Sequence, residues 1–172
     1  MRSVWITLLI SAAPALAGAM TIGSADLKDG APMPSAQIYP PCGGQNVSPA
    51  LAWSDAPPGA RSFVLTMIDL SVKPSDWSHW IIADIPPGVT HVAHGAGGLP
   101  PPARGVASNM GSDRYAGPCP PPGTGVHRYE ITVWAMPTPT VALRPDGPAT
   151  ALAAQLAHVS LAHASLTATA GQ

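Results

Sequence analysis

Residues 115–136 read YAGPCPPPGTGVHRYEITVWAM, and they join a proline-rich loop directly to a segment with a strand pattern. Each proline fixes one backbone torsion and the glycines allow positive ones, so we expect a stiff loop. Beyond the loop, apolar and polar residues alternate with the period of two that is typical of a strand. His127 therefore lies at the start of this strand. The segment brings Tyr115, Cys119, His127 and Tyr129 toward one place.

The chain has 172 residues, which fits one folded domain, and we expect that domain to span residues 18–172. The net charge is -1 and only 10% of the residues are charged, so the sequence has no basic surface for a nucleic-acid partner. Proline and glycine are abundant, with 22 and 17 residues, but five tryptophans and several β-branched apolar runs indicate a packed core. These features predict a β-rich domain with long, stiffened loops.

Residues 1–17 have the three parts of a secretory signal peptide. Arg2 comes first, an apolar run from Val4 to Ala13 follows, and a small-x-small cleavage site ends at Ala17. The apolar run is too short for a transmembrane helix, and no later segment has the roughly 18 apolar residues that a membrane span needs. We therefore expect an exported protein, periplasmic or secreted, with no membrane span.

Cys42 and Cys119 are the two cysteines of the chain. In an oxidising compartment two cysteines most simply pair, and the disulfide would join a glycine-rich loop to the proline-rich loop. Two free thiols or half of a metal site are the alternatives, which the absence of CxxC spacing disfavours. We therefore predict a Cys42–Cys119 disulfide.

His91 and His94 have a spacing that could place two imidazole rings on one helical face, as a metal site requires. Glycines follow directly at positions 95, 97 and 98, and no neighbouring carboxylate or cysteine accompanies the two histidines in the sequence. We therefore expect a solvated loop here, and no metal site.

Two further segments predict long strands. Residues 61–69 (RSFVLTMID) are apolar on both faces, which predicts a central strand that ends at Asp69. Residues 77–85 (WSHWIIADI) predict a second strand, in which simple alternation places four residues on one face: His79, Ile81, Ala83 and Ile85. If the two strands are neighbours, Asp69 and His79 meet at one edge of the sheet.

Weaker patterns complete the chain. We expect a short strand at residues 36–39 and inward-pointing side chains at Leu51 and Trp53. Residues 86–104 are expected to form turns and a loop. A helix is predicted from 149 to 159, where proline precedes a run with helical spacing, and the pattern of residues 160–168 fits a strand as well as a helix.

Several of these segments together resemble the phosphatidylethanolamine-binding protein family, in its bacterial Raf kinase inhibitor-like branch. The matching segments are the strand that ends in Asp69 and four others: GQNVSPALAW at 44–53, SHW at 78–80, GPCPPPGTGVHRY at 117–129 and SLAHASLTA at 160–168. The resemblance rests on their combined order and spacing, and it covers residues 25–168. It implies a mostly β fold, an antiparallel β-sandwich of two sheets with a small C-terminal helix, and a compact pocket for phosphate or a phospholipid headgroup.

By position, the resemblance implies a ligand-binding pocket made of five residues: Asp69, His79, Pro118, His127 and Tyr129. The two rings and the Tyr129 hydroxyl would donate to an anion, and Asp69 would orient one imidazole. Backbone N–H groups of the glycine–proline loop would act as an anion-binding nest. If protonated histidines hold the anion, its affinity should rise as the pH falls.

This chain departs from the family pattern after Asp69. The family usually reads DPDAP there, whereas this chain reads DLSVKP, so that Ser71 replaces the second acid. We expect Ser71 to reduce the repulsion of a doubly charged phosphate and to weaken the contact with an ammonium group. Ser71 and Tyr115 are therefore predicted to modulate the pocket.

The leading function is that of an exported, non-enzymatic binding protein for a small anion, such as phosphate or a phosphorylated headgroup. The alternative is a protein-interaction module, because relatives in this family inhibit proteases or kinases, and a protease is the easier partner for an exported protein. An enzyme that uses the Asp, two His and Tyr for acid–base chemistry is disfavoured, because no GxSxG or HExxH motif is present. We therefore expect no catalytic residue and no cofactor.

Overall fold

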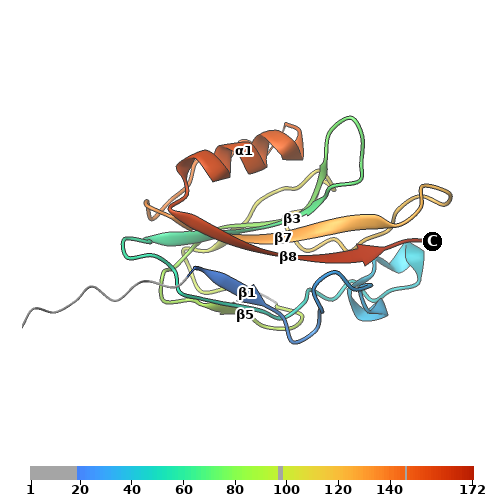
Figure 1. The fold of residues 1–172 in the computed structure, drawn as a ribbon, viewed down its shortest axis with the longest axis horizontal. Helices are drawn as coiled ribbons and strands as arrows, with labels where there is room; N and C mark the ends of the chain where they lie inside the picture. The colour runs from blue at the N-terminus through green and yellow to red at the C-terminus, as the bar shows by residue number, and fades with distance from the viewer. Residues whose placement is uncertain (1–18, 97–98, 146) are drawn as a thin grey trace, which may run out of the picture.

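Two antiparallel sheets and one helix form the fold in a computed structural model that describes residues 19–96, 99–145 and 147–172. Figure 1 shows helix α1 (Ala149–Val159) on one face of the larger sheet and the smaller sheet on the other. The predicted fold class is confirmed: a mostly β protein with two antiparallel sheets and a helix near the C-terminus. The expected signal peptide lies outside the described residues.

The larger sheet has five strands in the order β6-β4-β3-β7-β8. In that order they are Arg104–Gly105, Trp77–Ile85, Ser62–Asp69, His127–Met136 and Ala162–Ala170. Every residue of β3 is buried, because this strand is central and both faces of the sheet are covered. The predicted central strand is therefore confirmed, and the segment after residue 160 forms a strand rather than a helix.

The smaller sheet has three short strands in the order β1-β2-β5: Thr21–Gly23, Leu51–Ser54 and His91–Val92. Leu51 and Trp53 point inward as predicted, while the residues between and after them are exposed. Strand β5 lies within the segment 86–104 that was expected to be turn and loop, and β6 begins at its last residue. Each has two residues, which is too short to produce an alternating pattern.

Residues 36–39 do not form the predicted strand. They fall in and after a short 3-10 helix, η1 (Ser35–Gln37), and a second one, η2 (Pro40–Cys42), follows. The flanking prolines at positions 34, 40 and 41 explain the difference, because proline has no N–H to donate to a sheet ladder. The Gln37 N–H donates instead to the carbonyl of Pro34 at 3.0 Å.

Strand β3 contributes to two separate cores. Its residues Phe63, Leu65 and Met67 pack between the sheets, where Trp53 also lies. Val64 points to the other face and packs in the core beneath α1. The helix buries three residues against this face: Ala149, Leu152 and Leu156. Within the described part of the chain, no helix is long and apolar enough to cross a membrane.

Strand β4 contains two irregularities in its pairing with β3, and they change which face its residues occupy. The partners of Met67 and Ile68 are Trp80 and Ser78, so His79 is an extra residue in β4. Ile85 joins the core between the sheets, whereas Ile81 and Ala83 lie in the core beneath α1. The predicted alternation that placed His79, Ile81, Ala83 and Ile85 on one face is therefore wrong.

Candidate ligand-binding site

Three strands of the larger sheet meet at one of its ends. Asp69, the last residue of β3, pairs with Trp77 at the start of β4 and with Tyr129 near the start of β7. Antiparallel neighbours produce this arrangement, because the end of one strand lies beside the beginnings of the next two. Figure 1 shows the loop before β7 extending from this end, near the C-terminus. The sheet thus brings Asp69, His79, His127 and Tyr129 together at the same end of these three strands.

Asp69 and His127 form a buried pair, with 2% and 6% of their surfaces exposed. Oδ2 of Asp69 accepts a hydrogen bond from Nδ1 of His127 at 2.7 Å, and Oδ1 accepts one from the Ser71 N–H at 2.8 Å. An ionised carboxylate only accepts, so the proton lies on Nδ1. Asp69 therefore fixes the orientation of the His127 ring, as second-sphere carboxylates do for histidine ligands.

The second nitrogen of His127 is also engaged. Its Nε2 lies 2.9 Å from Oγ1 of Thr124, which lies 2.7 Å from the carbonyl oxygen of Pro121. The single hydroxyl proton of Thr124 can serve only one of these two acceptors. When Thr124 donates to Pro121, His127 donates from both nitrogens. Thr124 was not predicted, and its hydroxyl three residues before the histidine was the only signal in the sequence.

His79 differs from His127 because one of its nitrogens is free. Nδ1 lies 3.0 Å from the carbonyl oxygen of Ala116, which can only accept, so Nδ1 carries a proton. Within the described residues, Nε2 of His79 has no hydrogen-bond partner. The fully buried side-chain atoms that lack a partner are Gln37 Oε1 and Trp53 Nε1, so His79 Nε2 is not fully buried. It therefore reaches solvent, although only 5% of the residue is exposed.

The surroundings of His79 favour its neutral form. Burial lowers the pKa of His79 below its ordinary value of 6.5, and the positive character of His127 acts in the same direction. The Ala116 and Gly117 backbone and the charge of Asp69 oppose this effect only in part. At neutral pH, His79 therefore presents a lone pair on Nε2 to the solvent side of the site.

Tyr129 is fully buried, and its ring meets the His79 ring edge-on with centroids 5.2 Å apart. Burial raises the pKa of Tyr129 above its usual range, and the nearby charge of Asp69 raises it further. The hydroxyl therefore stays protonated at neutral pH. Tyr129 thus belongs to the cluster and packs against the His79 ring.

Tyr115 supports the site from behind. Its hydroxyl donates to the carbonyl of Gln37 at 2.8 Å, and its ring lies edge-on to Trp80 with centroids 5.3 Å apart. Burial raises the pKa of Tyr115 above its usual range, so this donor also stays protonated. Tyr115 therefore fixes the loop that carries Ala116, and its hydroxyl does not face His79.

The loop that forms one wall of the site, residues 115–119, is tied to residues 37–46. Asn46 bridges the two segments: its Nδ2 donates to the Tyr115 carbonyl at 3.3 Å, and its Oδ1 accepts from the Gly117 N–H at 2.7 Å. Tyr39 N–H donates to the carbonyl of buried Pro118 at 3.0 Å. Asn46 therefore joins two segments that are about 70 residues apart, a contact that local sequence patterns do not indicate.

The predicted disulfide between Cys42 and Cys119 is confirmed and joins the same two segments. Part of the glycine–proline loop has no free N–H group for the predicted backbone nest. The Gly117 N–H is already bound to Asn46, and the prolines at 118 and 120–122 have no N–H to offer. The wall is therefore a stiff surface with few donors of its own.

Ser71 lies beside the cluster but is bound to the backbone. Its Oγ accepts a hydrogen bond from the Arg128 N–H at 3.0 Å, and its own N–H donates to Asp69. The side chain thus joins the loop after β3 to the start of β7. Ser71 therefore holds the ends of two neighbouring strands together.

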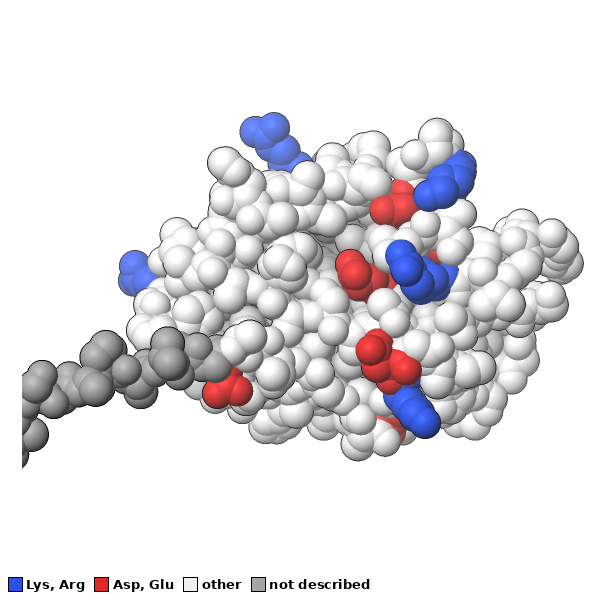
Figure 2. Space-filling view, in the orientation of Figure 1, with Lys and Arg blue, Asp and Glu red and all other residues white. Residues whose placement is uncertain are grey.

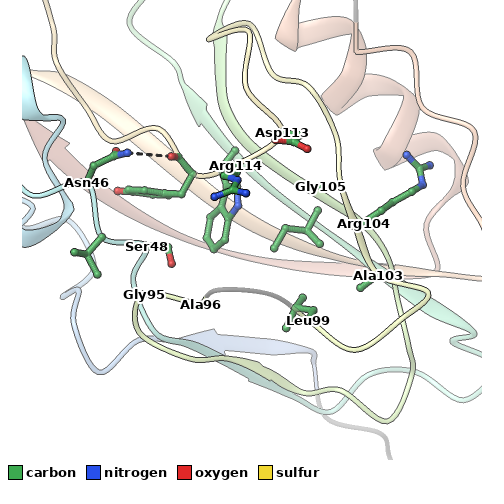
Figure 3. A pocket seen from close by; sticks show the side chains of 14 residues that line it. Asn46, Ser48, Gly95, Ala96, Leu99, Ala103, Arg104, Gly105, Asp113 and Arg114 are labelled. Atoms are coloured by element: carbon green, nitrogen blue, oxygen red, sulfur yellow. Dashed lines mark hydrogen bonds between the residues drawn. The ribbon is translucent and has the colours of Figure 1, made fainter.

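A separate hollow of about 580 Å³ lies elsewhere on the molecule, between the loop near residue 95 and the segment 103–115. Figure 3 shows Arg104 and Arg114 at this hollow and the hydrogen bond between Asn46 and Tyr115. Arg104 is engaged, since its Nε donates to Asp84 at 2.7 Å. Of the residues predicted for the pocket, only the modulator Tyr115 lines this hollow.

The charged groups elsewhere form no extended field on the face drawn in Figure 2, where basic and acidic side chains are few and interspersed. His94 has a carboxylate partner that the local sequence did not reveal, because its Nδ1 lies 2.9 Å from Oδ2 of Asp26. His91 lies in β5. Over residues 19–96, 99–145 and 147–172, no three His, Cys, Asp or Glu side chains gather as a metal site would require.

Known relatives share both the sequence and the fold. YbcL of Escherichia coli K12 is 34% identical over 132 residues, which are 72% of this chain and 72% of YbcL. The crystal structure of E. coli YbcL, titled a new member of the mammalian PEBP family, matches with a TM-score of 0.81 at 27% identity. That match covers 90% of this chain and 99% of the YbcL chain.

A second relative is longer than this chain. LppC of Mycobacterium tuberculosis H37Rv is 38% identical over 118 residues, which are 69% of this chain and 56% of LppC. This chain therefore spans about half the length of that relative. The family model described as phosphatidylethanolamine-binding protein matches residues 23–171, almost the whole described domain. The chain belongs to the phosphatidylethanolamine-binding protein family.

Proposed function

We propose that this chain is a non-enzymatic binding protein that holds phosphate or a phosphorylated headgroup at the cluster of Asp69, His79, His127 and Tyr129. One observation carries the proposal: His79 keeps Nε2 free beside a buried Asp69–His127 pair whose hydrogen bonds are satisfied within the protein. Such a cluster combines one open, oriented polar atom with a preorganised surrounding, which favours binding without rearrangement. Membership of a family of binding proteins supports the same conclusion.

Calorimetric titration of phosphate and phosphoethanolamine into the purified protein tests this proposal. We expect both ligands to bind, and His79→Gln to weaken binding by roughly tenfold, the cost of one hydrogen bond to a charged group. His91→Gln is the matched control, because His91 is exposed and lies in the other sheet. Absence of binding by either ligand would contradict the proposal, and so would equal losses in the two variants.

Ser71 provides a second comparison at the same site. An aspartate at this position adds a negative charge close to Asp69, which should repel a doubly charged phosphate and attract an ammonium group. We expect Ser71→Asp to bind phosphate more weakly than wild type and phosphoethanolamine relatively better. Equal or stronger phosphate binding by Ser71→Asp would show that the charge at this position does not tune the site.

An enzymatic role has one geometric argument in its favour. Thr124, His127 and Asp69 have the hydroxyl–imidazole–carboxylate order of nucleophilic catalysis, at 2.9 and 2.7 Å. However, the Pro121 carbonyl lies 2.7 Å from Thr124 Oγ1 and competes with His127 for the single hydroxyl proton. We therefore favour binding. Hydrolysis of an activated ester that is lost in Thr124→Val would establish the enzyme instead.

A protein-interaction role, such as inhibition of a protease, is the second candidate. Two apolar residues flank the binding cluster in sequence and are unusually exposed: Trp77 at 38% and Val126 at 72%. Exposed apolar side chains near a site often mark a docking surface. If inhibition of a protease is lost in Val126→Ser but kept in His79→Gln, the surface carries the function and the cluster does not.

We also propose that the protein is exported. The signal-like pattern at residues 1–17 supports this, and so does the Cys42–Cys119 disulfide, because disulfides persist in oxidising compartments. The name of the relative LppC includes the word lipoprotein. Cell fractionation with N-terminal sequencing tests the proposal, and we expect a periplasmic or secreted product that begins at Gly18.

A further inference from the structure

At neutral pH, most polar side-chain atoms of the cluster are already hydrogen-bonded within the protein. Asp69 accepts at both oxygens, and His127 is bound at both nitrogens. His79 uses its Nδ1 proton for the Ala116 carbonyl. Among Asp69, His127 and His79, the polar side-chain atom without a hydrogen-bond partner in the described structure is Nε2 of His79, and in the neutral ring that atom carries a lone pair rather than a proton.

We propose that the site selects a tetrahedral anion that carries its own proton, a hydrogen phosphate with a P–OH group, because that proton is donated to His79 Nε2. This inference rests on the proposed function and specifies the ligand for the same site. A fully deprotonated anion of equal charge and shape presents only lone pairs to Nε2. The site therefore distinguishes hydrogen phosphate from sulfate by one proton.

The tautomer of His79 is fixed by geometry. The Ala116 carbonyl cannot donate, so a neutral His79 ring must place its proton on Nδ1 to keep the 3.0 Å contact. The carbonyl itself is held in place by the Tyr115, Gly117 and Asn46 contacts of the wall. In the other neutral tautomer the proton would lie on Nε2. The lone pair of Nδ1 would then face the lone pairs of the Ala116 carbonyl, which is unfavourable.

The groups that face His79 keep the ring neutral near pH 7. They are Asp69 on β3, His127 and Tyr129 on β7, and the Ala116–Gly117 backbone of the wall. Burial has the largest effect on the pKa of His79 and lowers it, and the attraction of Asp69 compensates only in part. As the pH falls below the ordinary histidine range, the ring gains a second proton and becomes a donor. Sulfate then becomes an acceptable ligand.

Sites built to hydrogen-bond a ligand proton reject analogues that lack it, because a buried polar atom is left without a partner. Phosphate and sulfate make a matched pair for this test, since both are tetrahedral and both are dianions above neutral pH. We expect phosphate to bind at least roughly tenfold more tightly than sulfate at pH 7.5, the effect of one hydrogen bond in a desolvated site. The preference should shrink as the pH falls through the pKa of His79, because the protonated ring also accepts sulfate.

The experiment is calorimetric titration of the full-length protein with sodium phosphate and with sodium sulfate at pH 7.5 and pH 5. Equal affinities at pH 7.5 would overturn the inference while leaving the proposed function intact. Binding of neither anion would overturn both. Binding of ethanolamine in place of phosphate would show that Nε2 accepts a hydrogen bond from an ammonium group. This result would overturn the assignment to phosphate.

Two further measurements make the test independent of any one variant. Nitrogen-15 NMR of the histidine rings at pH 7.5 should show Nε2 of His79 without a proton, and a protonated Nε2 would refute the inference. His79→Gln should lose the preference for phosphate over sulfate, because its amide can present either a donor or an acceptor. His91→Gln, the exposed control, should keep the wild-type preference.

Discussion

Replacement of Asp69 by asparagine tests the buried pair at the centre of the site. The carboxylate of Asp69 accepts two hydrogen bonds at its two oxygens, one from His127 Nδ1 and one from the Ser71 N–H. An asparagine side chain has the same shape, but it has only one acceptor oxygen and its nitrogen donates. In Asp69→Asn one of the two donors therefore faces another donor.

The expected cost follows from the burial of these groups. Asp69 is 2% exposed and His127 is 6% exposed, so water cannot replace the lost partner. Hydrogen bonds to charged groups contribute about 1.5–3 kcal/mol, and an unpaired buried donor adds its own desolvation cost. We therefore expect the free energy of unfolding to fall by about 2–3 kcal/mol. In a domain of this size this corresponds to a decrease in Tm of roughly 5–10 °C.

Urea denaturation, followed by tryptophan fluorescence, measures this change together with the m value. Asp113→Asn is the matched control, because Asp113 is exposed, and its stability should stay within about 0.5 kcal/mol of wild type. Wild-type stability of Asp69→Asn would refute the argument that both oxygens are needed. A changed m value would show instead that the variant alters the unfolded ensemble.

Three further predictions concern the wall and the pH dependence. Gly117→Ala places a Cβ against the Gln37 carbonyl oxygen, so it should destabilise the fold by about 3 kcal/mol in urea melts. Gly88→Ala, where the added Cβ meets open space, should not. Reduction of Cys42–Cys119, 77 residues apart, should lower the unfolding free energy by up to about 4 kcal/mol, and an equally stable double serine variant would contradict this. Because folding lowers the pKa of His79, stability should fall as the pH drops below 6.5, and less steeply in His79→Gln.

The strands that position the site could be predicted because their patterns are local. Residues 61–69 and 127–136 have long apolar or alternating patterns, and each forms the expected strand. The face of β4 could not be predicted in the same way. Its extra residues at the pairing irregularities depend on the register with β3, which is a property of two strands rather than one.

The residues of the cluster could be named from the sequence, but their roles could not. Which histidine Asp69 contacts depends on pairing: Asp69 lies opposite Tyr129, and this brings His127 rather than His79 to its carboxylate. The role of Thr124 depends on the path of the loop, and that of Asn46 depends on contacts across about 70 residues. Patterns of short range do not encode such contacts.

The wall of the site has a consequence for the order of folding. Tyr115 and Gly117 are held by Gln37 and Asn46, partners that lie 69 to 78 positions away in the sequence. Closing loops of this length costs chain entropy before any contact is gained, so such contacts form slowly. Neighbouring β3 and β4 can pair much earlier, because only seven residues, 70–76, separate them. The Ala116 carbonyl, which sets the tautomer of His79, therefore reaches its place late in folding. The protein can then bind its ligand only after the whole domain has folded.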